Sequence, residues 1–246
     1  MRVVVLSAGT GSRLGELTKN KPKALVQVGG VPLVDHLLAF IDHSFFEEIL
    51  VVGGFAFDGL KAYLESKRIS KIKVIWNPLY RKGNIFTLLR AMESFSGDSF
   101  LVTNIDHIYP RGMFDKMKRS LDGLVAMCDF DRALTADDMK VKLNHDHKTI
   151  KMISKQLTDF DGGYIGMTFV DRNAFGLYQE AVNKALAKFG DACVVENVLQ
   201  LLAETGNPPK SCDLSGFGWY EVDNQEDLKK AEKRVLLNRS MFPYIR

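Results

Sequence analysis

The sequence predicts an α/β fold built on a doubly wound, mainly parallel sheet. Through residues 1–110, short β-branched runs alternate with amphipathic stretches, which is the strand–helix order of such a sheet. The runs lack the strict apolar–polar alternation of a sheet with one solvated face, so helices should cover both faces. The expected strands are 2–6, 49–52, 73–76 and 100–103, and the expected helices are 34–41, 59–66 and 85–95.

The second half is expected to extend the same sheet. Helical patterns cover 110–120, 174–189, 194–205 and 225–238, and strand patterns cover 124–127, 140–143, 149–154, 162–170 and 219–223. No internal repeat, low-complexity tract or flexible linker separates the halves. The prediction is therefore a single domain over 1–246.

Composition excludes several classes of protein. The chain is 46% hydrophobic and 26% charged, as in ordinary globular proteins, and its net charge of +3 is too small to indicate nucleic-acid binding. The three cysteines lie far apart without metal-ligand spacing, which indicates a reducing compartment. No apolar run approaches the roughly 20 residues of a membrane span, and no leader precedes the first strand. We expect a cytoplasmic protein without membrane insertion.

The most informative segment is the glycine-containing loop after the first strand, which reads LSAGTGSRL over 6–14 and is followed by Pro22 and Lys23. Glycines allow a sharp turn that points backbone N–H groups beyond the sheet, and such a nest binds phosphates. Arg13 and Lys23 add two positive charges suited to a triphosphate. A dinucleotide fingerprint would need glycine at Leu14, and the Gly-Lys-Ser/Thr of a Walker loop is absent. The alternative is a glycine-rich turn with solvated charges.

This loop resembles the L-x-A-G-x-G-[ST]-R-L…P-K signature of the sugar-phosphate nucleotidyltransferases. The resemblance implies a GT-A-like, Rossmann-type fold with a mixed, mainly parallel sheet, and transfer of a nucleoside monophosphate to a phosphorylated acceptor. It implies catalytic roles for Arg13 and Lys23, which also bind the nucleotide. The other nucleotide-binding residues of the loop are Leu6, Ala8, Gly9, Thr10, Gly11 and Ser12.

Two aspartates are candidate Mg²⁺ ligands. Asp106 follows the strand at 100–103, and a carboxylate at the carboxyl end of a central strand can hold Mg²⁺ against phosphate oxygens. Asp223 resembles the second metal aspartate of the family. Many relatives have an acid where this chain has Asn104, which is expected to bind nucleotide. The alternatives are a turn aspartate at Asp106 and a helix N-cap at Asp223.

The base and ribose are expected to contact segments after the second and third strands. Gly53 and Gly54, which follow the second strand, would let a planar base approach the backbone. Tyr80, Asn84 and Phe86 form a Tyr-x-x-x-Asn-x-Phe pattern that resembles the small cytidylyltransferases. Asn84 and Thr87 are therefore predicted to bind nucleotide. For Asn84 the alternative is a helix N-cap, which is compatible with nucleotide binding.

The whole chain most resembles the cytidylyltransferases that act on inositol 1-phosphate, whose products lead to di-inositol phosphate. The resemblance implies CTP as donor, a nucleotide-binding half over 1–110 and an acceptor-binding half over 111–246. In some organisms the activity is fused to a membrane phosphotransferase, whereas this chain is expected to be the free-standing form. The candidate acceptor residues are Lys142, Tyr164, Gly166 and Glu196.

The acceptor and some rival functions stay open at this point. A choline acceptor would need an aromatic and acidic cage, which Tyr164, Phe217, Trp219 and Tyr220 could supply, so phosphocholine and sugar 1-phosphates are alternatives. The run 129–131 (Asp-Phe-Asp) looks like the metal motif of nucleotide-sugar glycosyltransferases. A non-catalytic nucleotide-binding module is a third class.

Oligomeric state is also open. Four apolar residues near the C-terminus could pack on the domain or on a second subunit as a homodimer: Met241, Phe242, Tyr244 and Ile245.

Overall fold

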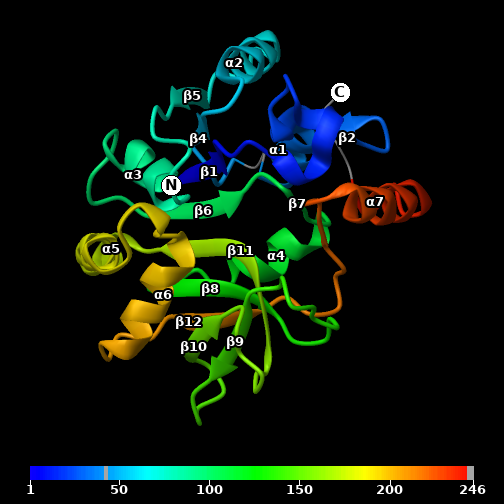
Figure 1. The fold of residues 1–246 in the computed structure, drawn as a ribbon. Helices are drawn as coiled ribbons and strands as arrows, with labels where there is room; N and C mark the ends of the chain where they lie inside the picture. Colours follow the sequence, from blue (N-terminus) through cyan, green and yellow to red (C-terminus); the bar gives the residue numbers. More distant parts are fainter. Residues whose placement is uncertain (42–43, 243–246) are drawn as a thin grey trace.

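The computed structural model describes residues 1–41 and 44–242, and a nine-stranded sheet runs through its centre (Figure 1). The strand order is β10-β9-β11-β6-β1-β4-β5, and β8 and β12 continue the sheet from β11. Neighbouring strands of the first half run parallel, as predicted. They are β1 (Arg2–Ser7), β4 (Glu48–Gly53), β5 (Ile72–Trp76) and β6 (Phe100–Asn104).

The second half joins this sheet through β11 (Gly162–Val170), which pairs antiparallel with β6 and makes the sheet mixed. Every residue of β11 is buried, because strands flank it on both sides. The remaining strands of this half are β8 (Leu124–Asp129), β9 (Lys140–Leu143), β10 (Ile150–Ser154) and β12 (Lys210–Asp213). The sequence pattern did not predict β12, since only Cys212 among its four residues is buried and apolar.

Helices cover both faces of the sheet, which confirms the doubly wound architecture. Successive residues of a strand point to opposite faces, and accordingly Val4 packs in one apolar cluster and Val5 in another. The first cluster takes residues of α3 (Ile85–Met92), α5 (Phe175–Phe189) and α6 (Val195–Glu204). The second takes residues of α1 (Leu33–Ile41), α2 (Phe57–Ser66) and α4 (Gly112–Lys118). None of the described helices is both long and apolar enough to cross a membrane.

A third apolar cluster fixes the C-terminal helix α7 (Gln225–Leu237) beside the loop that follows β1. Val235 of α7 packs there with Leu14 of the loop, Val222 and Phe242. Two short antiparallel ribbons belong to this region: β2 (Gln27–Val28) with β3 (Val31–Pro32), and β7 (His107–Ile108) with β13 (Tyr220–Glu221). This packing places Asp223, which is near the end of the sequence, beside the loop that follows β1. Of the C-terminal apolar residues, Tyr244 and Ile245 lie outside the described residues.

Candidate active site

The loop after β1 folds back on itself at Gly11, which has the left-handed backbone conformation with φ of 63°. A Cβ atom at this position would lie 3.1 Å from Thr18 Cγ2 and 3.2 Å from Lys23 Cβ. The Thr18 hydroxyl donates a hydrogen bond of 2.8 Å to the Gly11 carbonyl oxygen. Glycine is therefore required here both for its backbone angle and for the close approach of Lys23.

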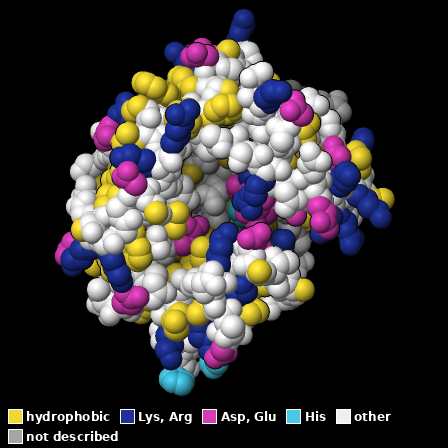
Figure 2. Space-filling model, in the orientation of Figure 1, with side chains coloured by type: hydrophobic (Ala, Val, Ile, Leu, Met, Phe, Trp, Pro, Cys, Tyr) yellow, Lys and Arg dark blue, Asp and Glu magenta, His cyan; other side chains and the backbone are white. Residues whose placement is uncertain are grey.

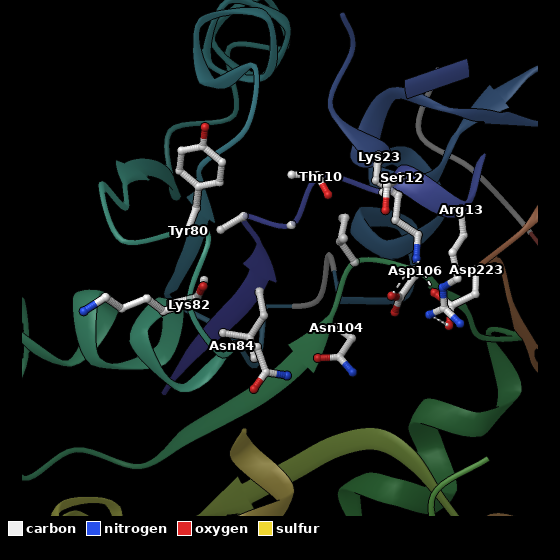
Figure 3. Close-up of a pocket in the computed structure, with 16 residues that line it drawn as sticks. Thr10, Ser12, Arg13, Lys23, Tyr80, Lys82, Asn84, Asn104, Asp106 and Asp223 are labelled. Carbon is white, nitrogen blue, oxygen red and sulfur yellow. Dashed lines mark hydrogen bonds and ion pairs between the residues drawn. The ribbon is translucent and has the colours of Figure 1, made fainter. Parts of the chain in front are cut away.

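Around this loop lies a cavity of about 310 Å³ at the carboxyl ends of β1 and β6 (Figure 3). It contains Arg13, Lys23, Asp106 and Asp223 at one end and Tyr80 and Lys82 at the other. The face of the molecule is hollowed near its centre, with acidic and basic side chains beside the hollow (Figure 2). The remaining lining residues are Leu6, Ala8, Gly9, Thr10, Gly11, Ser12, Asn84, Thr87, Asn104 and Ile105.

Lys23 holds the two predicted metal aspartates together. Its Nζ donates to Asp106 Oδ2 at 2.9 Å and to Asp223 Oδ1 at 2.6 Å, and Arg13 Nη2 lies 2.5 Å from Asp223 Oδ2. Burial opposes the charged form of Lys23, but the two carboxylates outweigh it and raise the lysine pKa. Burial alone would raise the pKa of Asp106, yet Lys23 and His107 hold it well below its usual range. Asp106 is therefore ionised at neutral pH.

A buried histidine lies against Asp106 on the side away from the loop. His107 Nδ1 is 2.7 Å from Asp106 Oδ1, and its ring stacks on Trp219 with centroids 5.2 Å apart. The β7–β13 ribbon pairs His107 with Glu221. Burial opposes the charged imidazole, but Glu221 and Asp106 raise the pKa of His107, and burial raises the pKa of Glu221 to about 7. Ligand atoms of Asp106, His107 and Glu221 all lie within 4.8 Å of one another.

A second cavity of about 240 Å³ adjoins the first. The two share five lining residues: Arg13, Asn84, Asn104, Asp106 and Asp223. The second cavity is otherwise lined by His107 and by second-half residues, which include Tyr164, Gly166, Glu196, Lys155, Asp137 and Asp138. Two occupants would therefore meet at the carboxylates, with one on the loop side and the other on the β11 side.

The shared carboxylates suit a hard divalent cation. Asp106 and Asp223 offer oxygen atoms that converge on one ammonium group, which shows that this point can accommodate a positive charge. The neighbouring Asn224, and not Asp223, caps α7, because its side chain accepts from the N–H groups of Glu226 and Asp227. The carboxylate of Asp223 is thus not used in a helix cap and faces both cavities.

A family model described as the MobA-like NTP transferase domain matches residues 3–134, which is more than half of the chain. The chain belongs to this family. The matched part includes the glycine loop, Lys23, Asn84 and Asp106, while Asp223 and the predicted acceptor residues lie beyond it.

Several curated proteins and solved structures resemble this NTP transferase over nearly its whole length. A bifunctional IPC transferase and DIPP synthase of Aquifex aeolicus is 28% identical over 95% of this chain and 51% of the relative. A choline-phosphate cytidylyltransferase of Streptococcus pneumoniae is 24% identical over 98% of this chain and 100% of the relative. The inositol-1-phosphate CTP transferase of T. maritima superimposes with a TM-score of 0.81 at 19% identity, over 98% of this chain and 97% of that one. The chain spans about half the length of the bifunctional relatives it matches.

In this NTP transferase, the family and fold predicted from the sequence are confirmed, whereas the roles of individual residues stay predictions. All predicted nucleotide residues except Gly53 and Gly54 line the first cavity. Gly53 instead packs beneath α2, where a Cβ atom would lie 3.0 Å from Leu60 and Phe57. The next residue, Gly54, makes the close approach: a Cβ atom there would be 2.7 Å from the Ala8 carbonyl oxygen and 2.2 Å from Tyr80 Cβ.

Asn84 links the two halves of the transferase. Its Oδ1 accepts a hydrogen bond of 2.9 Å from the Val195 N–H at the start of α6, and its side chain does not cap α3. The adjacent Gly83 donates to the Asp191 carbonyl oxygen at 2.7 Å. A Cβ atom on Gly83 would lie 1.8 Å from the Cys193 carbonyl oxygen, so no side chain fits there. Asn84 therefore lines both cavities from a fixed position.

The lysine that lines the second cavity is not the one that was predicted. Tyr164, Gly166 and Glu196 line the second cavity, but Lys142 does not. The Lys142 ammonium instead pairs with Asp159 at 2.7 Å and Asp161 at 3.1 Å. The lysine that reaches the cavity is Lys155, which follows β10.

The Asp-Phe-Asp run at 129–131 is occupied by structural hydrogen bonds. Asp129 is buried, its Oδ1 accepts from the backbone N–H groups of Asp131 and Arg132, and its Oδ2 accepts from Trp219 Nε1 at 2.8 Å. These bonds give Asp129 the role of anchoring a turn. The sequence analysis missed His107, Glu221 and Lys155 as site residues. No local pattern reveals them, because the β7–β13 ribbon and the end of β10 place them at the site.

Proposed function

We propose that this chain transfers CMP from CTP to inositol 1-phosphate, giving CDP-inositol and pyrophosphate. The observation that carries the proposal is the pair of adjoining cavities, which meet at Arg13, Asp106 and Asp223. The first cavity has a glycine loop and two cations for a triphosphate, and the second has carboxylates and a lysine for a phosphorylated polyol. Similarity to proteins named IPC transferase and inositol-1-phosphate CTP transferase supports this choice.

The donor would lie with its phosphates on the loop and its base toward Tyr80. The N–H groups near Gly9 and Gly11 and the charges of Arg13 and Lys23 would hold the triphosphate. An acceptor phosphate oxygen would then attack the α-phosphorus in line, and pyrophosphate would leave. A phosphate monoester has a second pKa of about 6, so it is already largely dianionic and needs no general base. Catalysis would rest on positioning and on neutralising charge.

Mg²⁺ is the cofactor we propose, held by Asp106 and Asp223. When bound, it would neutralise phosphate charge where the two substrates meet. Lys23 and Arg13 are the present partners of these carboxylates, and both side chains line the donor cavity. They would exchange the carboxylates for phosphate oxygens when the nucleotide enters.

The second cavity favours a polyol phosphate over a choline phosphate. Glu196, Glu221, Asp137 and Asp138 offer acceptors for hydroxyl groups, and Lys155 offers a charge for the phosphate. A quaternary ammonium group binds best in a cage of aromatic rings. Only Tyr164 among the aromatic residues proposed for such a cage lines this cavity; Phe217, Trp219 and Tyr220 do not.

A pyrophosphate-release assay over four nucleoside triphosphates and three acceptors tests this function. The acceptors are inositol 1-phosphate, phosphocholine and glucose 1-phosphate. We expect the highest kcat/KM with CTP and inositol 1-phosphate in the presence of Mg²⁺. Faster turnover with phosphocholine or glucose 1-phosphate would refute the acceptor, and no release with any pair would refute the transferase reaction.

A further inference from the structure

A third cavity, of about 790 Å³, is lined in part by Trp219, whose ring also stacks on His107. It is bounded by the turn after β8, by the segment that carries Trp219 and Tyr220, and by α7. Its volume falls within the roughly 300–1,000 Å³ of small-molecule sites. It shares no lining residue with the donor or acceptor cavity. The proposed reaction therefore leaves it unused.

Positive charge dominates the walls of this cavity. Four cationic side chains line it, namely Arg132, Lys230, Lys233 and Arg234, against the carboxylates of Asp129 and Asp131. Asp129 is buried, and its carboxylate already accepts hydrogen bonds from Trp219 and two backbone N–H groups. These internal donors stabilise its negative charge. The side of the molecule where α7 lies carries several exposed basic side chains (Figures 1 and 2).

Among the described residues, three of the four cations have no carboxylate partner. Lys230 pairs with Glu226 at 2.7 Å. In the described part of the chain, no carboxylate oxygen comes within 4.0 Å of Arg132, Lys233 or Arg234. Exposed cations on a helix are usually solvated, but three unpaired ones facing one concave site create a positive potential that attracts anions.

Arg132 is held in place by an aromatic ring and not by an acid. Its guanidinium carbon lies 4.0 Å from the centroid of Trp219, and its Nη1 donates to the Trp219 carbonyl oxygen at 3.3 Å. Such a cation–π contact fixes the guanidinium while leaving its other N–H groups free to donate. The floor beside it includes Tyr220 and Leu237. The cavity thus combines a fixed arginine, two exposed cations and an apolar surface.

We propose that this cavity binds a small phosphate-bearing polyanion. The phosphates would contact Arg132, Lys233 and Arg234, and an organic body would pack on Tyr220 and Leu237. The proposal rests on this cavity alone and stands whether or not the transferase reaction is the one proposed above.

Trp219 gives a direct readout of binding. The chain has two tryptophans, Trp76 and Trp219. Trp76 is half exposed on β5 and is replaced in the variant Trp76→Phe, which leaves Trp219 as the reporter. Emission is followed while tripolyphosphate, which offers charge alone, or ATP, which adds an organic body, is titrated in. Tighter binding of ATP identifies an organic phosphate as the ligand class, and tighter binding of tripolyphosphate an inorganic one.

Two double variants in the Trp76→Phe background distinguish the cavity from general charge. Lys233→Gln with Arg234→Gln removes two cations from the cavity. Both residues are exposed on a helix, and glutamine has a similar helix propensity, so these changes should preserve folding. Arg119→Gln with Lys229→Gln removes the same charge from exposed positions outside it. We expect the Kd to rise at least about tenfold in the first, since charge-assisted hydrogen bonds to the phosphates are lost. The Kd should change little in the second.

Two results would overturn the proposal. One is the absence of a saturable change in emission, together with the absence of binding heat by calorimetry, for both probes. The other is the same Kd in the two double variants. Equal weakening in both would indicate attraction to net charge alone, and unchanged affinity in both would indicate binding at the donor cavity.

Discussion

Lys23→Met tests the charge bridge on which the donor site depends. The lysine side chain is 10% exposed, and the two carboxylates it joins are 20% and 18% exposed. Removing one partner of a fully buried ion pair costs about 3–5 kcal/mol, whereas an exposed pair contributes about 0–1 kcal/mol. Because these groups are mostly but not fully buried, we expect a loss of about 2–3 kcal/mol in the free energy of unfolding. Urea unfolding followed by circular dichroism measures it.

The response to Mg²⁺ makes this prediction specific. If Asp106 and Asp223 are the metal ligands, Mg²⁺ would compete with the ammonium for them in the wild type and would take the place of the ammonium in the variant. We expect Mg²⁺ to stabilise Lys23→Met by at least about 1 kcal/mol more than it stabilises the wild type. Turnover should nevertheless fall by about 10²–10³, because a charge that stabilises the transferred phosphoryl group is lost.

Lys19→Met is the matched control. Lys19 lies in the same loop and pairs with Glu16, but both side chains are mostly exposed. Its loss should change the free energy of unfolding by less than about 0.5 kcal/mol, with the same Mg²⁺ response as the wild type. The reasoning fails if Lys23→Met is no less stable than this control, or if Mg²⁺ stabilises both variants equally.

Four further predictions concern the loop, the acceptor cavity, the turn after β8 and the metal. Gly11→Ala should lose about 1–2 kcal/mol of stability from its left-handed backbone and raise the KM for CTP, while Gly9→Ala, which has open space around it, should leave thermal unfolding unchanged. Glu196→Gln should raise the KM for the acceptor about tenfold or more, because one charge-assisted hydrogen bond to it is lost. An equal rise in the KM for CTP would contradict the assignment of Glu196 to the acceptor cavity. Asp129→Ala should lower the free energy of unfolding by about 2–4 kcal/mol, because the Trp219 N–H and two backbone N–H groups lose their acceptor. A changed Mg²⁺ requirement would argue instead that Asp129 binds a metal. EDTA should abolish pyrophosphate release without changing the far-UV circular dichroism, and loss of the helical signal would show that the metal is structural.

The donor half was largely predictable because its chemistry is local in sequence. Consecutive apolar residues such as Val3, Val4 and Val5 indicate a strand covered on both faces, and all three are buried. The loop residues that are predicted to bind phosphate follow directly after that strand. Even so, the ribbon at 27–32 was missed, because two-residue strands leave no periodic pattern.

The acceptor half was less predictable because it depends on pairing between distant strands. Lys142 and Lys155 are both lysines near strands, and the sequence does not show which one faces the cavity. A register shift between Ile150 and Met152 lies in the β9–β10 pair, and a shift of one residue turns a side chain to the other face. His107 and Glu221 become neighbours only through a ribbon between segments more than a hundred residues apart.

The contacts of Gly83 and Asn84 with the segment before α6 have a consequence for how substrates meet. Because backbone and amide groups join the halves beside the proposed reacting centre, these contacts oppose a separation of the two cavities there. On the proposed function, the spacing between donor and acceptor would be set before either binds, so less entropy would be lost in aligning them during each turnover. A fixed spacing would also limit the acceptors that can react, because a larger acceptor would have to break these contacts. Selectivity among phosphorylated alcohols is, on this view, a property of a rigid frame.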